Sequence, residues 1–325
     1  MSNRELLEII ENYIAQIPIP TEPEKLYKPI RYTLAEGGKR LRPMLTILAS
    51  QLYSADIAAV LPAAAAVEIF HNFTLLHDDI MDNSIMRRGK PSVHVKWDKN
   101  VAILSGDVMS ILSYKLLAEC APQYLPQVLE VFNTMATQVC EGQQYDMDFE
   151  TQKRVSVVEY MNMIELKTSV LLGGATLIGA IIGGADSSHH TILQRFATEL
   201  GLAFQLQDDL LDTYGDERLG KPIGGDILEG KQTFLKIMAL SRADESTRHI
   251  LRHTHQDEKL TNEEKIAKIK AVYDKLDIRH ITEQQIAIKF ERALTLLDSL
   301  TKCGVSEQRI APLREFAMSL MNREK

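Results

Sequence analysis

Residues 75–91 read LLHDDIMDNSIMRRGKP and close a segment, 62–83, in which apolar residues recur with helical spacing. Positions i and i+4 of a helix share a face and lie about 6 Å apart along its axis. Asp78 and Asp82 therefore point the same way, with Asp79 beside them. Apolar neighbours place this helix against a core: Leu75, Leu76, Ile80 and Met81.

A second aspartate set of the same form stands about 130 residues later, in FQLQDDLLDTYGD at 204–216. It consists of Asp208, Asp209 and Asp212, and it lies near the end of another expected helix. Like charges at i and i+4 cost about 0.2–0.5 kcal/mol per pair. Anions near a helix C-terminus cost roughly 0.3–1 kcal/mol more. An unfavourable arrangement that occurs twice indicates a cation bound between carboxylates.

Oxygen ligands without His or Cys partners suit a hard cation, and magnesium typically bridges carboxylates and phosphate oxygens. The alternating ligand loop of an EF-hand is absent. The alternative for either set taken alone is a solvated acidic surface.

The loop GGKRLRP at 37–43 predicts an anion site between two helices. One helix is expected from Thr21 and Pro23 to Gly37-Gly38, and the next from Pro43 to about Tyr53. Glycines let a ligand approach the backbone, and a helix N-terminus offers free amides. Lys39 and Arg42 add positive charge.

Further basic residues separate into two groups, although each alone is typical of a solvated surface. One group, with magnesium and the aspartates, is expected to hold one diphosphate: Arg87, Lys167, Lys221 and Lys231. The other is expected to hold a second diphosphate without metal: Lys39, Arg42, His71 and Arg88.

Helical periodicity dominates the chain and strand alternation is nearly absent, which predicts one all-α domain over 1–325, a helical bundle around a central cavity. Besides 62–83, helices are expected at 105–119, 125–149, 156–184, 187–214, 231–253, 261–274, 281–301 and 305–322. The apolar run 169–185 carries five glycines and is expected to be a buried helix rather than a membrane span. Thr261 and Glu264 fit a capping box.

The bulk composition favours a cytoplasmic protein. The acidic residues near the N-terminus fit neither a signal peptide nor a transit peptide. Three scattered cysteines give no disulfide framework, and the net charge of −7 argues against broad nucleic-acid binding.

The order and spacing of these motifs resemble the trans-isoprenyl diphosphate synthases, or polyprenyl synthetases. The resemblance is carried by GGKRLRP, HNFTLLHDDIMD, MRRGKP, EGQQYDMD, ELKTS, FQLQDDLLD and GKPIGGD. It implies the isoprenoid synthase fold, a homodimer, and three magnesium ions between two facing DDxxD motifs.

The resemblance also implies roles for individual residues. Asp78, Asp82 and Asp208 would bind metal directly, whereas Asp79, Asp209 and Asp212 would act directly or through water. Arg87, Lys167 and Lys221 would contact an allylic diphosphate, with Lys231 close by. Isopentenyl diphosphate would be contacted by Lys39, Arg42, His71 and Arg88. Gln143 and Asp146 match positions that line the site.

The implied reaction begins when the allylic carbon–oxygen bond breaks, with metal and cationic side chains stabilising the departing charge. The double bond of isopentenyl diphosphate attacks the carbocation, and a proton is then lost. Gln205 and the Lys167-Thr168 backbone are candidate dipoles facing the cation. The rival functions are a class I terpene cyclase and a non-catalytic prenyltransferase subunit.

Product length is expected to depend on Phe70, Phe73 and Thr74, which share one helical stripe with Asp78. Phe73 lies about 7.5 Å below Asp78 along the axis. In the resembled family, a bulky residue five positions before the first aspartate shortens the product. The expected product has fifteen or twenty carbons, with twenty favoured.

Overall fold

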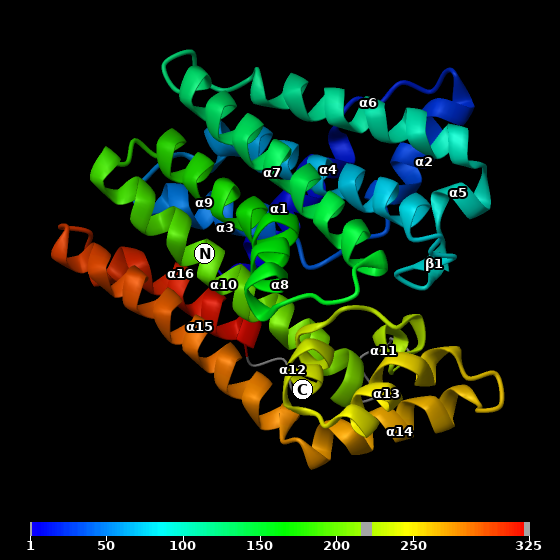
Figure 1. Cartoon of the computed structure of the whole chain (residues 1–325). Helices are drawn as coiled ribbons and strands as arrows, with labels where there is room; N and C mark the ends of the chain where they lie inside the picture. Colours follow the sequence, from blue (N-terminus) through cyan, green and yellow to red (C-terminus); the bar gives the residue numbers. More distant parts are fainter. Residues whose placement is uncertain (1, 216–222, 322–325) are drawn as a thin grey trace. The chain divides into compact units, whose positions relative to one another are not determined.

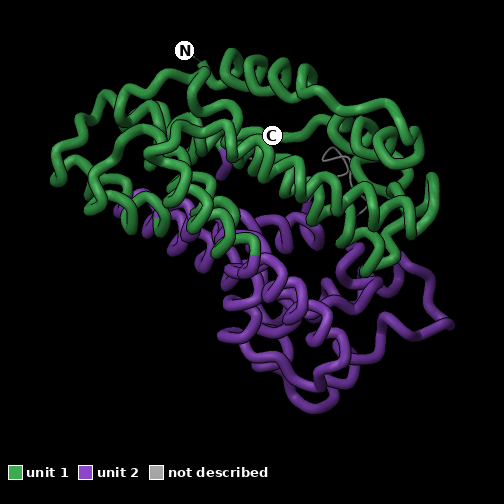
Figure 2. The backbone as a smooth tube through the Cα atoms, turned by 90° about the horizontal axis from the view of Figure 1, so that it is seen from above, with its two compact units in different colours: residues 1–136, 171–195, 297–319 green, residues 137–170, 196–296, 320–325 purple. Residues whose placement is uncertain are grey.

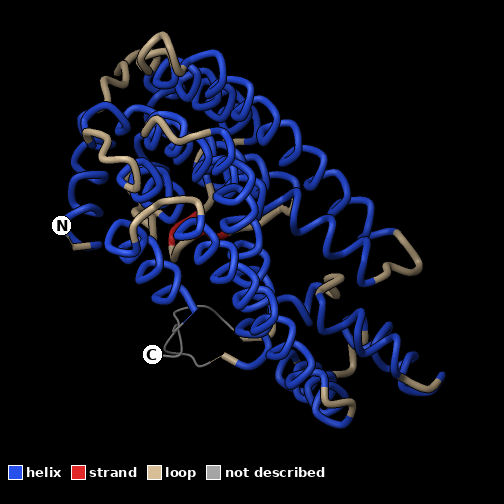
Figure 3. The backbone as a smooth tube through the Cα atoms, turned by 90° about the vertical axis from the view of Figure 1, so that its left-hand side faces the viewer, coloured by secondary structure: helices blue, strands red, loops and turns tan. Residues whose placement is uncertain are grey.

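A computed structural model describes residues 2–215 and 223–321 and shows a protein built almost entirely of helices (Figures 1 and 3). The expected all-α class is confirmed. Within the described residues the only strands form one short antiparallel hairpin, β1 (Met86–Arg87) and β2 (Lys90–Pro91). The chain divides into two compact units, coloured separately in Figure 2.

Unit 1 comprises residues 1–136, 171–195 and 297–319. Besides the hairpin, it contains α1 (Asn3–Gln16), α2 (Glu24–Leu34), α3 (Leu41–Gln51), α4 (Ile57–Met81), α5 (Val93–Lys96), α6 (Lys99–Leu117), α9 (Val170–Ile182) from its second residue, and all but the end of α16 (Glu307–Met321).

Unit 2 comprises residues 137–170, 196–296 and 320–325. It contains α8 (Val157–Ile164), the π-helix η1 (Glu165–Ser169), α11 (Gly225–Glu229), α12 (Phe234–Arg242), α13 (Glu245–His253), the 3-10 turn η3 (Thr254–Gln256) and α14 (Asn262–Lys275). The unit boundaries fall inside α7 (Leu125–Thr151), α10 (Ser187–Tyr214) and α15 (Ile278–Lys302).

The core of unit 1 is built on α4, which packs against α3 and α6. Asp56 caps its first turn by accepting a hydrogen bond from the Ala58 amide at 3.1 Å. This cap lets the helix begin five residues before Pro62, where the sequence had placed its start. Residues 63–70 of α4 are all buried, so the helix that carries the first aspartate set is rigidly embedded.

The glycine-rich run expected to be a buried helix is α9, and that prediction is confirmed. Residues 171–182 are all buried. A side chain at Gly179 would clash with the Thr46 carbonyl of α3, and one at Gly174 would clash with Met135. Small residues therefore let α9 approach its neighbours closely.

Two apolar clusters hold unit 2 together. The first includes Phe149, Tyr160, Leu206 and Phe234, which join α7, α8, α10 and α12. The second includes Leu235, Leu251 and Tyr273, which join α12, α13 and α14. The second aspartate set lies on α10, directly beside the first cluster.

Several expected helix boundaries were wrong. The helix expected over 231–253 is two helices, because Ala243 has extended backbone and Asp244 caps α13 by accepting from the Thr247 amide at 2.8 Å. The helix over 156–184 contains the π-turn η1. The sequence analysis did not anticipate α1, α5, α11 or the hairpin. The capping box of Thr261 and Glu264 is confirmed.

Two helical runs have the length and apolar composition of a membrane span, Ile57–Met81 and Val157–Ile182. Within their most apolar windows, 61% and 72% of the residues are buried inside the protein. Core helices of water-soluble proteins pass the same test, so these runs are weak evidence for a membrane span.

Candidate functional site

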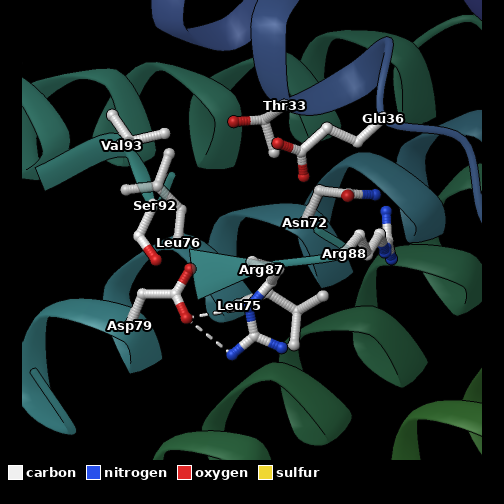
Figure 4. A pocket seen from close by; sticks show the side chains of 10 residues that line it. All are labelled: Thr33, Glu36, Asn72, Leu75, Leu76, Asp79, Arg87, Arg88, Ser92 and Val93. Carbon is white, nitrogen blue, oxygen red and sulfur yellow. Dashed lines mark hydrogen bonds and ion pairs between the residues drawn. The ribbon is translucent and has the colours of Figure 1, made fainter. Parts of the chain in front are cut away.

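The first aspartate set occupies the last turn of α4, as the sequence predicted, but its members differ in environment. Asp79 is buried and forms an ion pair with Arg87 (Figure 4). Nε and Nη2 of Arg87 lie 2.8 Å and 2.7 Å from Oδ1 of Asp79. The same Nη2 lies 3.4 Å from Oδ2 of Asp78. Burial raises the pKa of Asp79, and Arg87 opposes that shift. Asp78 is only half-buried and Asp82 is exposed.

The GGKRLRP loop has a backbone that ordinary residues rarely adopt. Gly37, Gly38 and Arg40 have φ values of 67°, 144° and 43°. Arg88 reaches across from the hairpin turn and donates from Nη1 to the Gly37 carbonyl at 2.5 Å. A Cβ at Gly38 would lie 3.3 Å from Cζ of Arg88, so the glycine leaves this approach open.

Arg42, His71 and Arg88 lie close enough to influence one another. Burial lowers the pKa of Arg42 to about 10, and the Arg88 charge adds to the effect. Burial, then Arg42 and Arg88, lowers the pKa of His71 well below its usual range, so the ring is neutral. The buried Nε of Arg42 has no hydrogen-bond partner among residues 2–215 and 223–321. Surplus positive charge with an unpaired donor is suited to an anion.

A small pocket lies beside these groups, between α2, α4 and the hairpin (Figure 4). It is lined by Thr33, Glu36, Asn72, Leu75, Leu76, Asp79, Arg87, Arg88, Ser92 and Val93. Thr33 Oγ1 and Asn72 Oδ1 are buried without a hydrogen-bond partner in the described part of the chain. The pocket therefore places Arg87 and Arg88 together at one polar cavity of unit 1.

The second aspartate set has its own inward-turned member, Asp209. Its Oδ2 accepts hydrogen bonds from the Tyr160 hydroxyl and from the Phe234 amide, the latter at 3.3 Å. Its Oδ1 accepts from Gln205 Nε2 at 3.2 Å. Burial raises the pKa of Asp209 to about 7, with repulsion from Asp226 adding to the shift.

The other two aspartates of this set are more accessible. Asp208 and Asp212 are half-buried on α10. Oδ2 of Asp212 accepts from the Asp226 amide at 3.0 Å, and its carbonyl accepts from the Gly224 amide at 2.7 Å. Asp212 thus fixes the start of α11, which leads to the segment carrying Lys231.

The π-turn η1 brings Lys167 and Thr168 to groups on α7 and α10. Lys167 Nζ lies 2.6 Å from Oδ2 of Asp146, and Thr168 Oγ1 donates to Gln205 Oε1 at 3.2 Å. A side chain at Gly142 would clash with the Lys167 backbone. The nearby Gln143 has a buried Nε2 without a partner among the described residues. The π-turn is a feature often found at functional sites.

The aromatic residues expected to limit product length form one cluster in unit 1. The Phe70 ring is buried and lies 5.4 Å from Phe73, centroid to centroid, and 5.1 Å from Phe132. Thr74 Oγ1 donates to the His71 carbonyl at 2.8 Å.

Magnesium fits the chemistry of both aspartate sets. Among the described residues, no three His, Cys, Asp or Glu side chains converge enough to hold a metal ion alone. Magnesium is usually bound through one or two carboxylates together with substrate phosphates and waters. The more accessible carboxylates on each helix match that mode, whereas Asp79 and Asp209 are buried.

Three residues that shape these sites were not singled out from the sequence: Arg40, Glu68 and Tyr160. Glu68 had a visible signal, because it is the lone charge in the apolar run 63–70. Tyr160 had none, since an aromatic residue on a core helix is common. Lys221, expected to contact a diphosphate, lies outside the described residues.

Comparison with known proteins identifies the family to which the chain is similar. Residues 23–276 match the polyprenyl synthetase family. A geranylgeranyl diphosphate synthase from Methanosarcina mazei is 47% identical over 225 residues, which cover 68% of this chain and 69% of that protein.

Solved structures give the same result. A crystal structure of a geranylgeranyl pyrophosphate synthase has a TM-score of 0.90 at 41% identity, covering 99% of this chain and 98% of its own. A polyprenyl synthase from Caulobacter crescentus, complexed with calcium and isoprenyl diphosphate, has a TM-score of 0.85 at 26% identity, covering 99% of this chain and 94% of its own.

Proposed function

The chain belongs to the polyprenyl synthetase family and is a short-chain trans-prenyltransferase, and we propose that its aspartate sets bind the magnesium of an allylic diphosphate. The reaction joins that substrate head to tail to isopentenyl diphosphate and releases pyrophosphate. The observation that carries the proposal is the family match together with two complete DDxxD sets on helix ends.

The aspartates divide into two classes in this proposal. The accessible carboxylates of Asp78, Asp82 and Asp208 bind metal directly, and Asp212 binds directly or through water. Asp79 orients Arg87, and Asp209 fixes Gln205 and Tyr160, so these two act mainly by position. Magnesium, three ions by the family expectation, supplies the positive charge that lets diphosphate leave its carbon.

The basic residues divide in the same way. Arg87, Lys167 and Lys231, with Lys221, contact the leaving diphosphate. Lys39, Arg42, His71 and Arg88 hold isopentenyl diphosphate without metal. The low pKa of His71 keeps its ring neutral, so the ring can donate one hydrogen bond without adding a further charge to the crowded arginines.

The allylic cation is stabilised by dipoles of unit 2. Gln205 is bound to both Thr168 and Asp209, which holds its amide in one orientation. A fixed dipole stabilises developing charge without the cost of reorientation. Asp146 positions Lys167 through their 2.6 Å ion pair.

The product is twenty carbons long in this proposal. The half-buried Phe73 closes the path below Asp78, and the smaller Thr74 beside it leaves room for a longer chain than two aromatic residues would. The names of the relatives, geranylgeranyl and geranylfarnesyl diphosphate synthases, support a product in this range.

We further propose a cytoplasmic homodimer in which both units belong to a single domain. The family match runs through both units, which supports one domain. One face of α6 exposes apolar side chains: Ile103, Leu104, Ile111 and Tyr114. A second copy of the chain would cover this face.

The deciding experiment incubates the purified chain with magnesium, isopentenyl diphosphate and dimethylallyl, geranyl or farnesyl diphosphate in turn. Mass spectrometry should detect geranylgeranyl diphosphate, and chelation of magnesium should stop its formation. A cyclic hydrocarbon would indicate a terpene cyclase. Absence of any product would indicate a non-catalytic subunit.

A further inference from the structure

Arg40 lies in the middle of the GGKRLRP loop, but its side chain points into the protein rather than toward the anion site. It is 2% exposed. Its Nε lies 2.8 Å from Oε1 of Glu11, and its Nη1 lies 2.8 Å from Oε1 of Glu68. Nη2 donates to Oε2 of Glu11 at 3.2 Å and to the Leu34 carbonyl at 3.0 Å.

We propose that Glu11 and Arg40 are positioning residues that fix this loop for the diphosphate of isopentenyl diphosphate, which makes α1 part of that site. The inference rests on the proposed function of Lys39 and Arg42. It adds an element that lies outside the matched family region, since α1 ends at Gln16 and the family match begins at residue 23.

The backbone of the loop explains why an anchor is needed. Gly37, Gly38 and Arg40 all have positive φ, which a non-glycine residue such as Arg40 adopts at an energetic cost. No side chain caps the first turn of α3, where Arg40 is the N-cap. The four hydrogen bonds of the Arg40 guanidinium hold this conformation. Because Lys39 and Arg42 flank Arg40, they are held with it.

The carboxylate of Glu68 connects Arg40 to Arg42 and Arg88. Glu68 is buried, and its Oε1 accepts from both Arg40 and Asn72. Its second oxygen is buried without a partner in the described part of the chain. Burial lowers the pKa of both Arg42 and Arg88, and the Glu68 charge opposes that shift in each, as it does for Arg40. One carboxylate therefore serves three arginines.

Glu11 supplies a second carboxylate for Arg40, because Glu68 alone cannot balance the charge of three arginines. Because Glu11 shares the charge of Arg40 with Glu68, more of the Glu68 charge is left to balance Arg42 and Arg88. Without it, Arg40 would draw more on Glu68, and the guanidinium would lose two of its four hydrogen bonds. The anion-binding arginines would then be less well ordered.

The packing of α1 makes this position stable. Leu6, Ile10 and Ile14 are buried, and the helix packs against α3 and α4. Glu8 lies on the same helix but is exposed and pairs with Arg4 at 3.1 Å. It therefore provides a matched control for the loss of a carboxylate from α1.

The test compares Glu11→Ala, Glu11→Gln and Glu11→Asp with Glu8→Ala in the full chain. We expect Glu11→Ala and Glu11→Gln to raise KM for isopentenyl diphosphate about three- to tenfold, with kcat and KM for the allylic substrate unchanged. Glu11→Asp should restore much of the affinity, and Glu8→Ala should match the wild type.

Direct binding of isopentenyl diphosphate, measured by calorimetry, should weaken by the same factor. Equal increases in both KM values, a loss confined to thermal stability, or no change would overturn the inference. These results differ from failure of the proposed function, in which the wild-type chain itself would form no product. Glu11→Gln keeps the shape of the side chain if Glu11→Ala does not fold.

Discussion

The ring of Phe73 lies 4.8 Å from the imidazole of His77, edge to face, one turn further along α4. His77 is in turn fixed, because its Nε2 lies 3.1 Å from the Ile103 carbonyl of α6 and its ring fills the space beside Gly106. Phe73 also packs on Phe70. It is therefore held from both sides, as the floor proposed beneath Asp78 would need to be.

Phe73→Ala should lengthen the product by one or more five-carbon units, because it removes the ring while leaving Phe70 in place. Mass spectrometry of the products formed from farnesyl diphosphate measures the change. Phe73→Tyr keeps the ring and should retain the original length. Unchanged products from Phe73→Ala would show that the floor lies elsewhere.

Both aspartate sets could be placed on helix ends from the sequence because helical periodicity is a local property. Local geometry also explains why Asp79 and Asp209 point inward while their neighbours do not. Successive side chains on a helix are rotated by about 100° around its axis. Their partners were not predictable. Arg87 arrives from a two-residue strand, and Tyr160 from a different helix, so only tertiary structure brings them together.

The π-turn η1, in contrast, could not be predicted from its own sequence. Its sequence, ELKTS, has ordinary helical composition, and a continuous helix was expected there. Gly142 of α7 closely approaches the Lys167 backbone, and Gly201 of α10 closely approaches Ser169. These contacts accompany the wider turn, and no pattern within 165–169 indicates them. The break between α12 and α13 was missed although Asp244 is a strong N-cap residue.

If Asp78 binds metal as proposed, Asp78→Asn should lower kcat by about 10²–10³-fold, because losing that ligand removes several kcal/mol of charge stabilisation from the leaving diphosphate. Steady-state assays over a range of magnesium concentrations measure this. Asparagine has nearly the same size as aspartate, and the Arg87 contact at 3.4 Å is long, so the unfolding free energy should change little. Glu130→Gln, an exposed change on α7, serves as the control and should leave kcat unaltered. A kcat close to that of the wild type, with an unchanged dependence on magnesium concentration, would contradict direct ligation.

Leu104→Glu combined with Ile111→Glu should convert the proposed dimer to a monomer. Both side chains are more than half exposed, at 58% and 59%, on one face of α6. A charge at the centre of an apolar interface would be desolvated without a partner. Light scattering coupled to size-exclusion chromatography measures the mass. Val158→Glu, at a 79% exposed site on α8, is the control. A monomeric wild type, or a dimer that survives both changes, would refute this interface.

Lys236→Met should stabilise the protein at pH 7, and the gain should shrink toward pH 10.5. Lys236 is buried on α12. Among the described residues, the Gly230 carbonyl is the only group to which its Nζ donates a hydrogen bond, at 2.5 Å. Burial lowers the pKa of Lys236 to about 8, from an ordinary 10.5. The unfolded chain thus binds more protons than the folded one between these values, so folding stability contributed by this group rises with pH across that range.

Below pH 8 the folded protein bears the whole cost of burying the charged Lys236 side chain. This cost corresponds to roughly 3 kcal/mol at about 1.4 kcal/mol per pKa unit. Loss of the hydrogen bond to Gly230 offsets about 1 kcal/mol of that gain. Urea unfolding at pH 7 and pH 10.5 should therefore show Lys236→Met more stable by about 1–3 kcal/mol at the lower pH only. Lys268→Met, at an exposed site on α14, should differ from the wild type equally at both pH values. A Lys236→Met variant that is less stable at pH 7 would mean that the ammonium stabilises the Gly230 turn by more than its burial costs.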